Sequence, residues 1–421
     1  MMKLDLIFGR SPSTDPRPLK SPALPDPAPH LTVTTDSQLQ AFCQRLARSK
    51  QIALDTEFVS ERTYRPVLCL VQVEADGEVA IVDPLSVKSM KPFWEAMARP
   101  GHKTIVHAGR GEVEFCVHAV GRPPAGLFDV QLAAGLAGVE YPAGYATLIA
   151  KLLGHASDKA ETRTDWHRRP LTSRQLQYAL DDIRHLPAIH DVLHARLHKL
   201  GRQAWMDEEM AKWLEEVEWS LSQERWRRVS GKAGLGSRGL AIVRELWRWR
   251  EGEAERRNTP ARRVLRDDLM VELARRQTAE VKRIQAVRGL ERQDLARQLP
   301  KIAEAIQRGL DLSAQECPAT VRHEHAPQLS VLGQFLFSAL GSLCRQRDLA
   351  PGLVGTPNDI RDLIAYRTGQ TAGSRQPQLA QGWRAEVIGQ VFDDLLAGKL
   401  AVRIADPASE CPLVFDRLDP G

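Results

Sequence analysis

The sequence contains no long hydrophobic run, and this absence limits where the protein can work. No stretch of its 421 residues approaches the ~20 consecutive apolar residues that a helix needs to cross a bilayer. The amino-terminal segment also lacks the apolar core of a secretory signal peptide. These absences predict a cytoplasmic protein without a membrane partner.

Cysteine is scarce, and its spacing argues against two kinds of site. The six cysteines lie far apart, without the close pairs typical of zinc sites or disulfide frameworks, at Cys43, Cys69, Cys116, Cys317, Cys344 and Cys411. Scattered cysteines of this kind fit a reducing compartment. We interpret them as small buried hydrophobic residues.

Positive charge is concentrated in one part of the chain. The net charge is only +5, yet residues 222–310 hold 22 Lys and Arg against 12 Asp and Glu, a net charge of +10. A basic segment beside a slightly acidic remainder is typical of a module that binds a polyanion. A solvated helical surface rich in arginine has the same composition, and charge alone leaves both interpretations open.

Hydrophobic periodicity predicts an α/β domain followed by helical domains. Strands expected at 51–58, 68–73 and 79–82 form an antiparallel meander, and strands alternating with helices follow it. This order indicates a mixed sheet flanked by helices. Helices are expected at 127–136, 145–153 and 173–200, and strand signals almost vanish beyond residue 200. The predicted division is a disordered Pro-rich arm (1–30), the α/β domain (31–200), a helical linker (201–235) and two all-α domains (236–315 and 326–406).

Two acids at the end of the first meander strand are the clearest candidates for chemistry. Asp55 and Glu57 are two residues apart, so in a strand their side chains point to the same face. Two carboxylates aimed at one point repel each other unless a cation lies between them, and oxygen ligands suit a divalent cation. Alone, the pair is also compatible with a turn or the start of a helix.

Further candidates lie on two predicted helices. Tyr178 and Asp182 are four residues apart and therefore share a helix face, whereas Asp181 is turned about 100° away. Glu112 and Glu114 follow the buried strand that ends at His107, and only one of them can face a shared site. Each feature has an ordinary structural explanation, namely a packed tyrosine or an exposed acid in a first helical turn. Their combination with Asp55 and Glu57 favours a metal site.

A set of motifs in a fixed order resembles a known family. The motifs run from Asp55-Thr56-Glu57-Phe58-Val59 through Arg62-Thr63-Tyr64-Arg65-Pro66, Leu70-Val71-Gln72, His107-Ala108-Gly109, Leu127-Phe128-Asp129, Thr164-Asp165-Trp166 and Arg169-Pro170-Leu171-Thr172 to Tyr178 and Asp182. They resemble ribonuclease D, a 3'-to-5' exoribonuclease of the DEDD superfamily in its tyrosine subclass. Beyond residue 230, Leu246-Trp247-Arg248-Trp249-Arg250 and Asn258-Thr259-Pro260 resemble an HRDC domain, and Gly382-Trp383-Arg384 resembles a second one.

The resemblance implies a fold, a reaction and a ligand set. The fold would be an α/β ribonuclease H-like exonuclease domain followed by two HRDC-type domains. The reaction would be two-metal hydrolysis that trims RNA 3' ends, such as those of transfer RNA precursors, with Mg²⁺ or Mn²⁺ as the two divalent cations. Asp55 would bridge both ions, Glu57 and Asp182 would hold the first, Glu112 would hold the second, and Tyr178 would orient the attacking water or help to deprotonate it. The chain is expected to act as a monomer.

One departure from the family pattern and four arginines complete the expectations. The family has an aspartate where this chain has Glu112, so the carboxylate reaches one methylene further. This departure leaves a catalytically weakened RNA-binding protein as one alternative. A DNA 3'-5' exonuclease is another, because the same catalytic set and helical module occur in DNA-processing proteins. Substrate phosphates are expected at Arg62, Arg65, Arg168 and Arg169, which lie close to the catalytic segments. A chain cut near residue 230 is expected to retain cleavage of short oligonucleotides.

Overall fold

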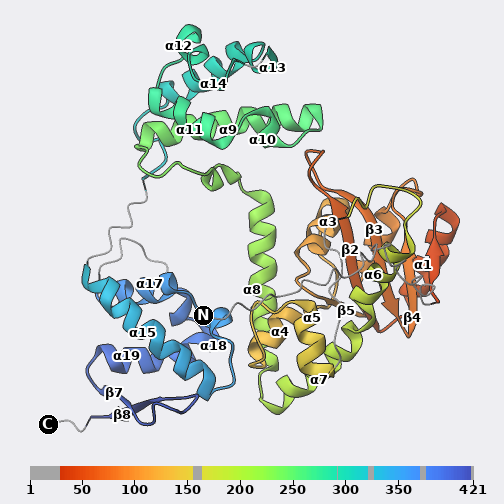
Figure 1. Cartoon of the computed structure of the whole chain (residues 1–421), viewed down its shortest axis with the longest axis vertical. Helices are drawn as coiled ribbons and strands as arrows, with labels where there is room; N and C mark the ends of the chain where they lie inside the picture. The colour runs from red at the N-terminus through yellow and green to blue at the C-terminus, as the bar shows by residue number, and fades with distance from the viewer. Residues whose placement is uncertain (1–28, 155–163, 292, 321–326, 370–375, 419–421) are drawn as a thin grey trace, which may run out of the picture.

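The computed structural model describes residues 29–154, 164–291, 293–320, 327–369 and 376–418 (Figure 1). The Pro-rich arm predicted for residues 1–30 therefore lies outside the described residues up to residue 28. Among the residues that are described, no helix combines the length and apolarity needed to cross a membrane.

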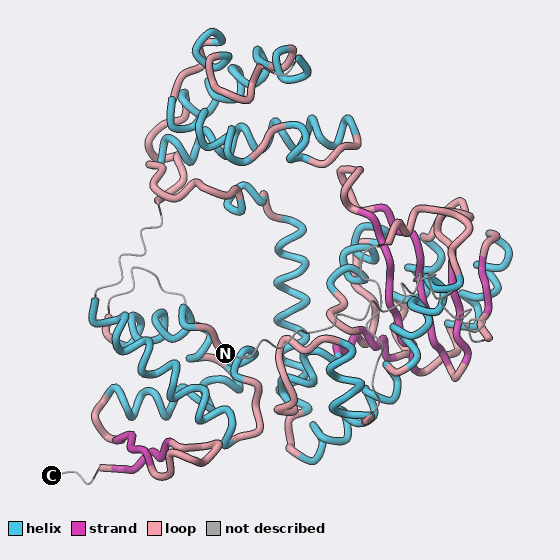
Figure 2. Tube along the Cα trace, viewed as in Figure 1, coloured by secondary structure: helices cyan, strands magenta, loops and turns pink. Residues whose placement is uncertain are grey.

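A mixed six-stranded sheet forms the centre of the amino-terminal half (Figure 2). In the spatial order β1-β4-β3-β2-β5-β6, the strands are β1 Leu31–Val33, β4 Glu78–Val82, β3 Val67–Ala75, β2 Gln51–Val59, β5 Lys103–Val106 and β6 Leu127–Asp129. Strands β2, β3 and β4 pair antiparallel, whereas β1, β5 and β6 pair parallel to their neighbours. Asp76 and Gly77 both have positive φ between β3 and β4, as a two-residue hairpin turn requires. The predicted meander and mixed sheet are confirmed.

Helices cover both faces of this sheet and make a three-layer domain. One face is covered by α1 Asp36–Leu46, α2 Lys91–Met97 and α3 Arg110–Val120, which pack on Ile52 and Leu54 of β2. The other face carries α4 Val130–Leu136, α5 Tyr145–Leu148, η1 Ile149–Leu153, α6 Ser173–Arg184 and α7 Leu186–Lys199. Because strand side chains alternate between faces, Ala53, Asp55 and Glu57 face this second layer.

Two of the predicted helices are divided in the structure. Residues 127–136 begin as strand β6, and the Asp129 side chain then caps α4 by accepting from the backbone N–H of Gln131. The helix predicted over 173–200 breaks at His185 into α6 and α7. Pro187 in the first turn of α7 has no N–H to continue the hydrogen-bond ladder of α6, which explains the break.

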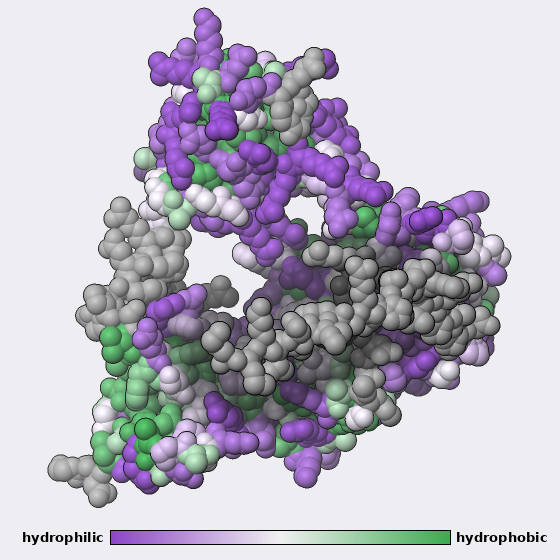
Figure 3. All heavy atoms as spheres, in the orientation of Figure 1, coloured by the Kyte–Doolittle hydropathy of each residue, from purple (hydrophilic) through white to green (hydrophobic). Residues whose placement is uncertain are grey.

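A long helix connects the sheet domain to a separate helical block. Helix α8 Gln203–Ser222 and the short η2 Arg225–Arg228 lead into α9 Ser237–Arg257, α10 Ala261–Val264, α11 Asp267–Arg276, α12 Val281–Gln285, α13 Gln293–Ala296 and α14 Leu299–Asp311 (Figure 1). The helices α9 to α14 enclose an apolar core of their own. Figure 3 shows hydrophilic side chains gathered over their surface, in agreement with the basic composition of residues 222–310.

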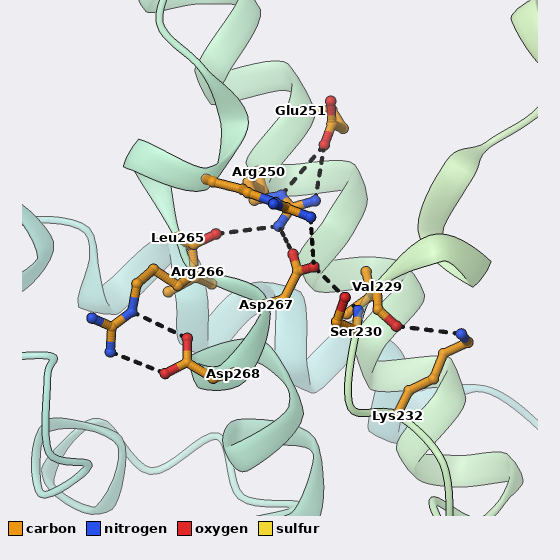
Figure 4. Close-up of polar contacts among 10 residues, drawn as sticks. Val229, Ser230, Lys232, Arg250, Glu251, Leu265, Arg266, Asp267 and Asp268 are labelled. Carbon is orange, nitrogen blue, oxygen red and sulfur yellow. Dashed lines mark hydrogen bonds and ion pairs between the residues drawn. The ribbon is translucent and has the colours of Figure 1, made fainter. Parts of the chain in front are cut away.

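A buried ion pair fixes the connecting segment to this block. The Arg250 guanidinium donates to Asp267 (Nη1 to Oδ1, 2.6 Å) and to the Leu265 carbonyl (3.2 Å). The second carboxylate oxygen of Asp267 accepts from the backbone N–H of Ser230 at 3.1 Å (Figure 4). Asp267 therefore joins α9, the start of α11 and the segment that follows η2.

The carboxy-terminal part is helical but ends in a hairpin. Its elements are α15 Pro327–Gln346, α16 Pro351–Val354, α17 Pro357–Arg367, η3 Gln378–Ala380, α18 Gly382–Arg384, η4 Ala385–Gly389, α19 Gln390–Leu396, β7 Leu400–Ile404 and β8 Leu413–Arg417. The antiparallel pair β7–β8 was not expected from the sequence, which shows few strand signals beyond residue 200. Both strands are short and only partly buried, so their hydrophobic alternation is weak.

The carboxy-terminal helices share one apolar core with the sheet domain. Leu353, Leu379 and Trp383 belong to the same buried cluster as Ile105 and Leu136. Trp205 of α8 stacks on Trp383 with ring centroids 5.3 Å apart. Gly138 approaches Asp348 so closely that an added Cβ would lie 2.5 Å from its backbone. A cut near residue 230 would expose this core. The expectation that such a truncation keeps its activity stays a prediction.

Candidate active site

Strand β2 presents the first two acids of the site side by side. Asp55 and Glu57 lie on the face covered by α6, opposite Gln72 and Leu70 of β3. A register irregularity follows Glu57, where β2 bends between Glu57 and Phe58. The pairing with β3 continues beyond the irregularity at Phe58 and Val59, whereas the pairing with β5 covers only residues 51–53, so the two carboxylates lie beyond the part of β2 that β5 pairs with.

Helix α6 brings the next two groups to the same point. It begins with a capping box, in which Thr172 accepts from the Gln175 backbone and the Gln175 side chain accepts from Thr172. The ligand atoms of Asp55, Glu57 and Asp182 all lie within 4.8 Å of one another. Tyr178, one turn before Asp182, donates a hydrogen bond from its hydroxyl group to the Asp182 carboxylate.

Asp181 takes no part in this convergence. Its carboxylate accepts from Gln177 Nε2 at 2.8 Å and lies 3.5 Å from Arg184, both on its own helix. The structure thus separates the two adjacent acids of α6 in the way that helical geometry predicts. Asp181 is a suitable control position for variants of Asp182.

Glu112 lies beside the group of three carboxylates, at the start of α3. It is 6% exposed and accepts a hydrogen bond from Thr56 Oγ1 at 2.5 Å. Its neighbour Glu114 instead pairs with Arg110 at 2.8 Å. The hydroxyl of Thr56 therefore fixes the Glu112 carboxylate, whose charge raises the pKa of Asp55 but which lies outside the group of three ligand atoms within 4.8 Å.

Asp129 positions Glu112 through the backbone, a role that the sequence did not reveal. Its carboxylate accepts from the backbone N–H groups of Ala108 (3.1 Å) and Gly109 (3.0 Å), in the turn between β5 and α3. Ala108 has a positive φ of 54°. A Cβ on Gly109 would lie 2.4 Å from the Val106 side chain, so only glycine fits there. Asp129 belonged to a recognised motif, but the spacing gave no sign of these contacts.

The four carboxylates destabilise one another's ionised forms. Burial, followed by the charges of Glu112, Asp182 and Glu57, raises the pKa of Asp55 well above its usual range. Burial and the charges of Asp182 and Glu112 raise the pKa of Glu57 to about 8. Burial likewise raises the pKa of Glu112 to about 7 and that of Asp182 to about 6. Carboxylate oxygens gathered in this way fit a hard divalent cation, whose charge offsets both the burial and the repulsion.

The raised pKa values predict that stability depends on pH and metal together. The pKa of Glu57 is about 8 in the folded, metal-free state and 4.5 when unperturbed. At a pH between these two pKa values, the folded state therefore holds a proton that the unfolded state has released. Without metal, the melting temperature should therefore fall by about 2 °C or more as the pH rises from about 5 to about 8. Thermal unfolding with chelator and with Mg²⁺ measures this difference.

Magnesium should remove most of this pH dependence, because it binds the ionised carboxylates. A Glu57→Gln variant is the matched control, since it has one titrating group fewer and should show a smaller pH effect. Equal pH slopes with chelator and with Mg²⁺ would contradict a metal site at these acids.

The four arginines expected at phosphates have different surroundings. Arg62 lies 3.5 Å from Asp165, and Arg65 pairs with Glu255 of α9 at 3.0 Å; both arginines are exposed, as is Arg168. Arg169 instead binds Asp83 through Nε and Nη2, both at 2.7 Å, and donates to three backbone carbonyls, at Cys69, Trp166 and Arg168. Arg169 thus ties the segment before α6 to the sheet.

Comparisons with known proteins identify the families to which two parts of the chain are similar. Residues 31–198 match a 3'-5' exonuclease family, and residues 239–306 match the HRDC domain family. The fold and the acidic cluster together define a 3'-5' exonuclease that uses divalent metal.

Relatives of similar length identify the family. The chain is 32% identical to ribonuclease D of Nitrobacter hamburgensis over 375 residues, covering 88% of this chain and 96% of that protein. It is 34% identical to ribonuclease D of Gluconacetobacter diazotrophicus over 381 residues, covering 89% and 93%. The crystal structure of Escherichia coli RNase D, described as an exoribonuclease involved in structured RNA processing, superposes with a TM-score of 0.76 at 25% identity, covering 88% of this chain and 99% of that one. The chain belongs to the ribonuclease D family and is a 3'-5' exoribonuclease.

Proposed function

We propose that this enzyme removes nucleotides one at a time from RNA 3' ends and releases 5'-monophosphates. The convergence of Asp55, Glu57 and Asp182 within 4.8 Å, with Tyr178 bonded to Asp182, is the observation that carries the proposal. Structured RNA such as transfer RNA precursors is the proposed substrate class, because the Escherichia coli relative is described as acting in structured RNA processing.

Four acids are proposed as ligands of two divalent cations, Mg²⁺ or Mn²⁺. Asp55 would contact both ions, Glu57 and Asp182 one of them, and Glu112 the other. Bound divalent ions of this kind activate water and stabilise the charge that develops on the attacking and leaving oxygens. Ionised carboxylates are needed for this binding, so the raised pKa values favour metal binding at neutral or higher pH.

Tyr178 is proposed to orient the attacking water by accepting a hydrogen bond at its phenol oxygen, while its own O–H is bonded to Asp182. Burial and the charges of Asp182 and Glu57 raise the pKa of its phenol far above the neutral range. In the metal-free protein the hydroxyl therefore keeps its proton at neutral pH. Its bond to Asp182 holds the ring in place beside the carboxylates.

Glu112 is proposed to act in catalysis despite its extra methylene. Glu112→Ala should lower kcat by about a hundredfold, because a displaced or missing ligand disturbs the positioning of the reacting groups. Single-turnover cleavage of a 3'-labelled oligoribonucleotide measures the effect. Glu114→Ala is the control, since Glu114 pairs with Arg110 and should retain wild-type rates. A Glu112→Ala variant as fast as the wild type would remove Glu112 from the site.

The basic helical block is proposed to hold the RNA outside the active site. Exposed cations on α9 to α14 and the hydrophilic surface in Figure 3 support phosphate contacts there. Arg62, Arg65 and Arg168 remain proposed phosphate contacts, whereas Arg169 is omitted because its guanidinium already binds Asp83.

The proposed domain division keeps the predicted boundaries at 31–200, 201–235, 236–315 and 326–406, and the separate core of α9 to α14 supports the third unit.

We further propose a monomer that acts in the cytoplasm. The cysteines, all free, fit a reducing compartment.

A time course on matched RNA and DNA strands tests the proposed function. We expect 5'-monophosphates to appear one at a time from the RNA 3' end with Mg²⁺ or Mn²⁺, and no product with chelator. Faster cleavage of the DNA strand would favour a DNA exonuclease. RNA binding without metal-dependent product would indicate a catalytically inactive binding protein.

A further inference from the structure

Gln72 lies next to the acidic site without belonging to the predicted ligand set. It is fully buried on β3 and is paired across the antiparallel ladder with Asp55. On its other side it faces Ile81 of β4. Directly paired residues of an antiparallel ladder share a face, with Cβ atoms about 4.5–5.5 Å apart. The Gln72 amide therefore lies beside Asp55, on the face that α6 covers.

Within the described part of the chain, this amide has no hydrogen-bond partner. Neither Nε2 nor Oε1 of Gln72 is bonded, although both atoms are buried. Its neighbours on this face include Leu70 and Ile81, which belong to the apolar cluster that packs against α6. Burying an unpaired amide destabilises a fold, and an apolar side chain of similar size would avoid that loss. Packing alone therefore does not explain a glutamine here.

The Asp55 carboxylate can accept a hydrogen bond from a neutral amide. The Asp55 side chain is partly buried among three other acids, and its carboxylate accepts from the Thr56 backbone N–H. An arginine or lysine at position 72 would neutralise the charge that attracts a divalent cation. An amide donates a hydrogen bond without carrying a competing positive charge, and the three rotatable bonds of glutamine let Nε2 reach the carboxylate. Such a partner fixes the direction in which the remaining carboxylate oxygen points.

We propose that Gln72 is a positioning residue: a rotation of its side chain, or one bridging water molecule, lets Nε2 donate to the Asp55 carboxylate and so orients Asp55 for divalent metal. This role rests on the proposed metal site at Asp55. Gln72 acts through Asp55 and touches neither substrate nor the reacting atoms.

The experiment compares full-length wild type, Gln72→Met and Ile81→Met. Methionine matches the size and flexibility of glutamine but lacks the amide, and Ile81→Met changes the packing beside Gln72 on the same face. Binding of Mn²⁺ to the metal-stripped protein is measured by electron paramagnetic resonance without RNA. Steady-state kinetics on an oligoribonucleotide and thermal unfolding accompany it.

For Gln72→Met we expect Mn²⁺ affinity and kcat each to fall by about 10- to 100-fold, the range typical of lost partners of metal ligands. KM for RNA should change by less than about threefold, and the metal-free Tm should stay equal or rise, because an unpaired buried amide is removed. Ile81→Met should bind Mn²⁺ and cleave RNA as the wild type does.

Three results would overturn the proposal. The first is wild-type Mn²⁺ affinity and kcat in Gln72→Met, and the second is equal losses in Ile81→Met. The third is a Gln72→Met protein that fails to fold, since the amide would then support the sheet rather than Asp55. If the wild type binds Mn²⁺ but does not cleave RNA, the proposed function fails, while the Mn²⁺ comparison still decides the role of Gln72.

Discussion

Replacing Asp55 by Asn should lower kcat on RNA by at least about a thousandfold, because the shared ligand of a two-metal site is lost. The same change should raise the melting temperature of the metal-free protein. Burial and three neighbouring carboxylates destabilise the ionised form of Asp55, and a neutral amide of the same shape removes that repulsion. Single-turnover cleavage and thermal unfolding in chelator measure the two effects.

The opposite directions of these effects separate catalysis from folding. A variant that merely unfolds would lose both activity and stability. Asp181→Asn serves as the control. Asp181 precedes Asp182 on α6, but its carboxylate contacts Gln177 and Arg184 of its own helix. Near wild-type cleavage by Asp55→Asn would refute the site, and so would a large loss in Asp181→Asn.

Arg384→Met should lower the free energy of unfolding by about 3–5 kcal/mol, the loss expected when a buried ion pair keeps only one partner. Arg384 donates to both carboxylate oxygens of Glu209, at 2.6 and 2.8 Å, and to the carbonyls of Val354 and Leu353. The side chains are only 4% and 10% exposed. Without Arg384, the Glu209 carboxylate would keep only Trp383 Nε1, at 3.1 Å, as its partner in this group. Urea unfolding monitored by tryptophan fluorescence measures the loss.

Two further variants test whether burial is the cause. Arg45→Met removes an exposed pair with Glu78, whose side chains are 47% and 56% exposed, and should cost less than about 1 kcal/mol. A double variant, Glu209→Leu with Arg384→Met, should recover part of the loss, because no unpaired charge remains buried. Equal effects of Arg384→Met and Arg45→Met would contradict the prediction. The expected loss also implies that the stability of the fold depends on a helix more than 300 residues away in sequence from β2.

Local sequence rules predicted much of the sheet domain and half of the site. The two-residue period of β2 placed Asp55 and Glu57 on one face, and the helical period placed Tyr178 with Asp182 and turned Asp181 away. These rules hold because a side chain's direction follows from the backbone to which it is attached. The meander was equally predictable, since the Asp76-Gly77 turn favours a tight hairpin.

Contacts between distant segments were beyond such rules. The Thr56 bond to Glu112, the Asp129 bonds to the turn before α3 and the pairing of Arg169 with Asp83 join residues that are 20 or more positions apart. Arg169 is an example. Its position near the catalytic motifs predicted a contact with substrate phosphate, but in the structure its guanidinium pairs with Asp83. The hairpin β7–β8 was missed because its strands are only partly buried.

The sequence by itself determined the fold class, the strand and helix that carry the acids, and the family. Residue type and spacing suffice for these, because periodicity and motifs are local. Only the tertiary structure decided that Glu112 is held beside Asp55, that Gln72 lies unpaired next to it, and that the last helices complete the core of the nuclease domain. Each of these depends on which surfaces meet when the chain packs, and that is a property of the whole fold.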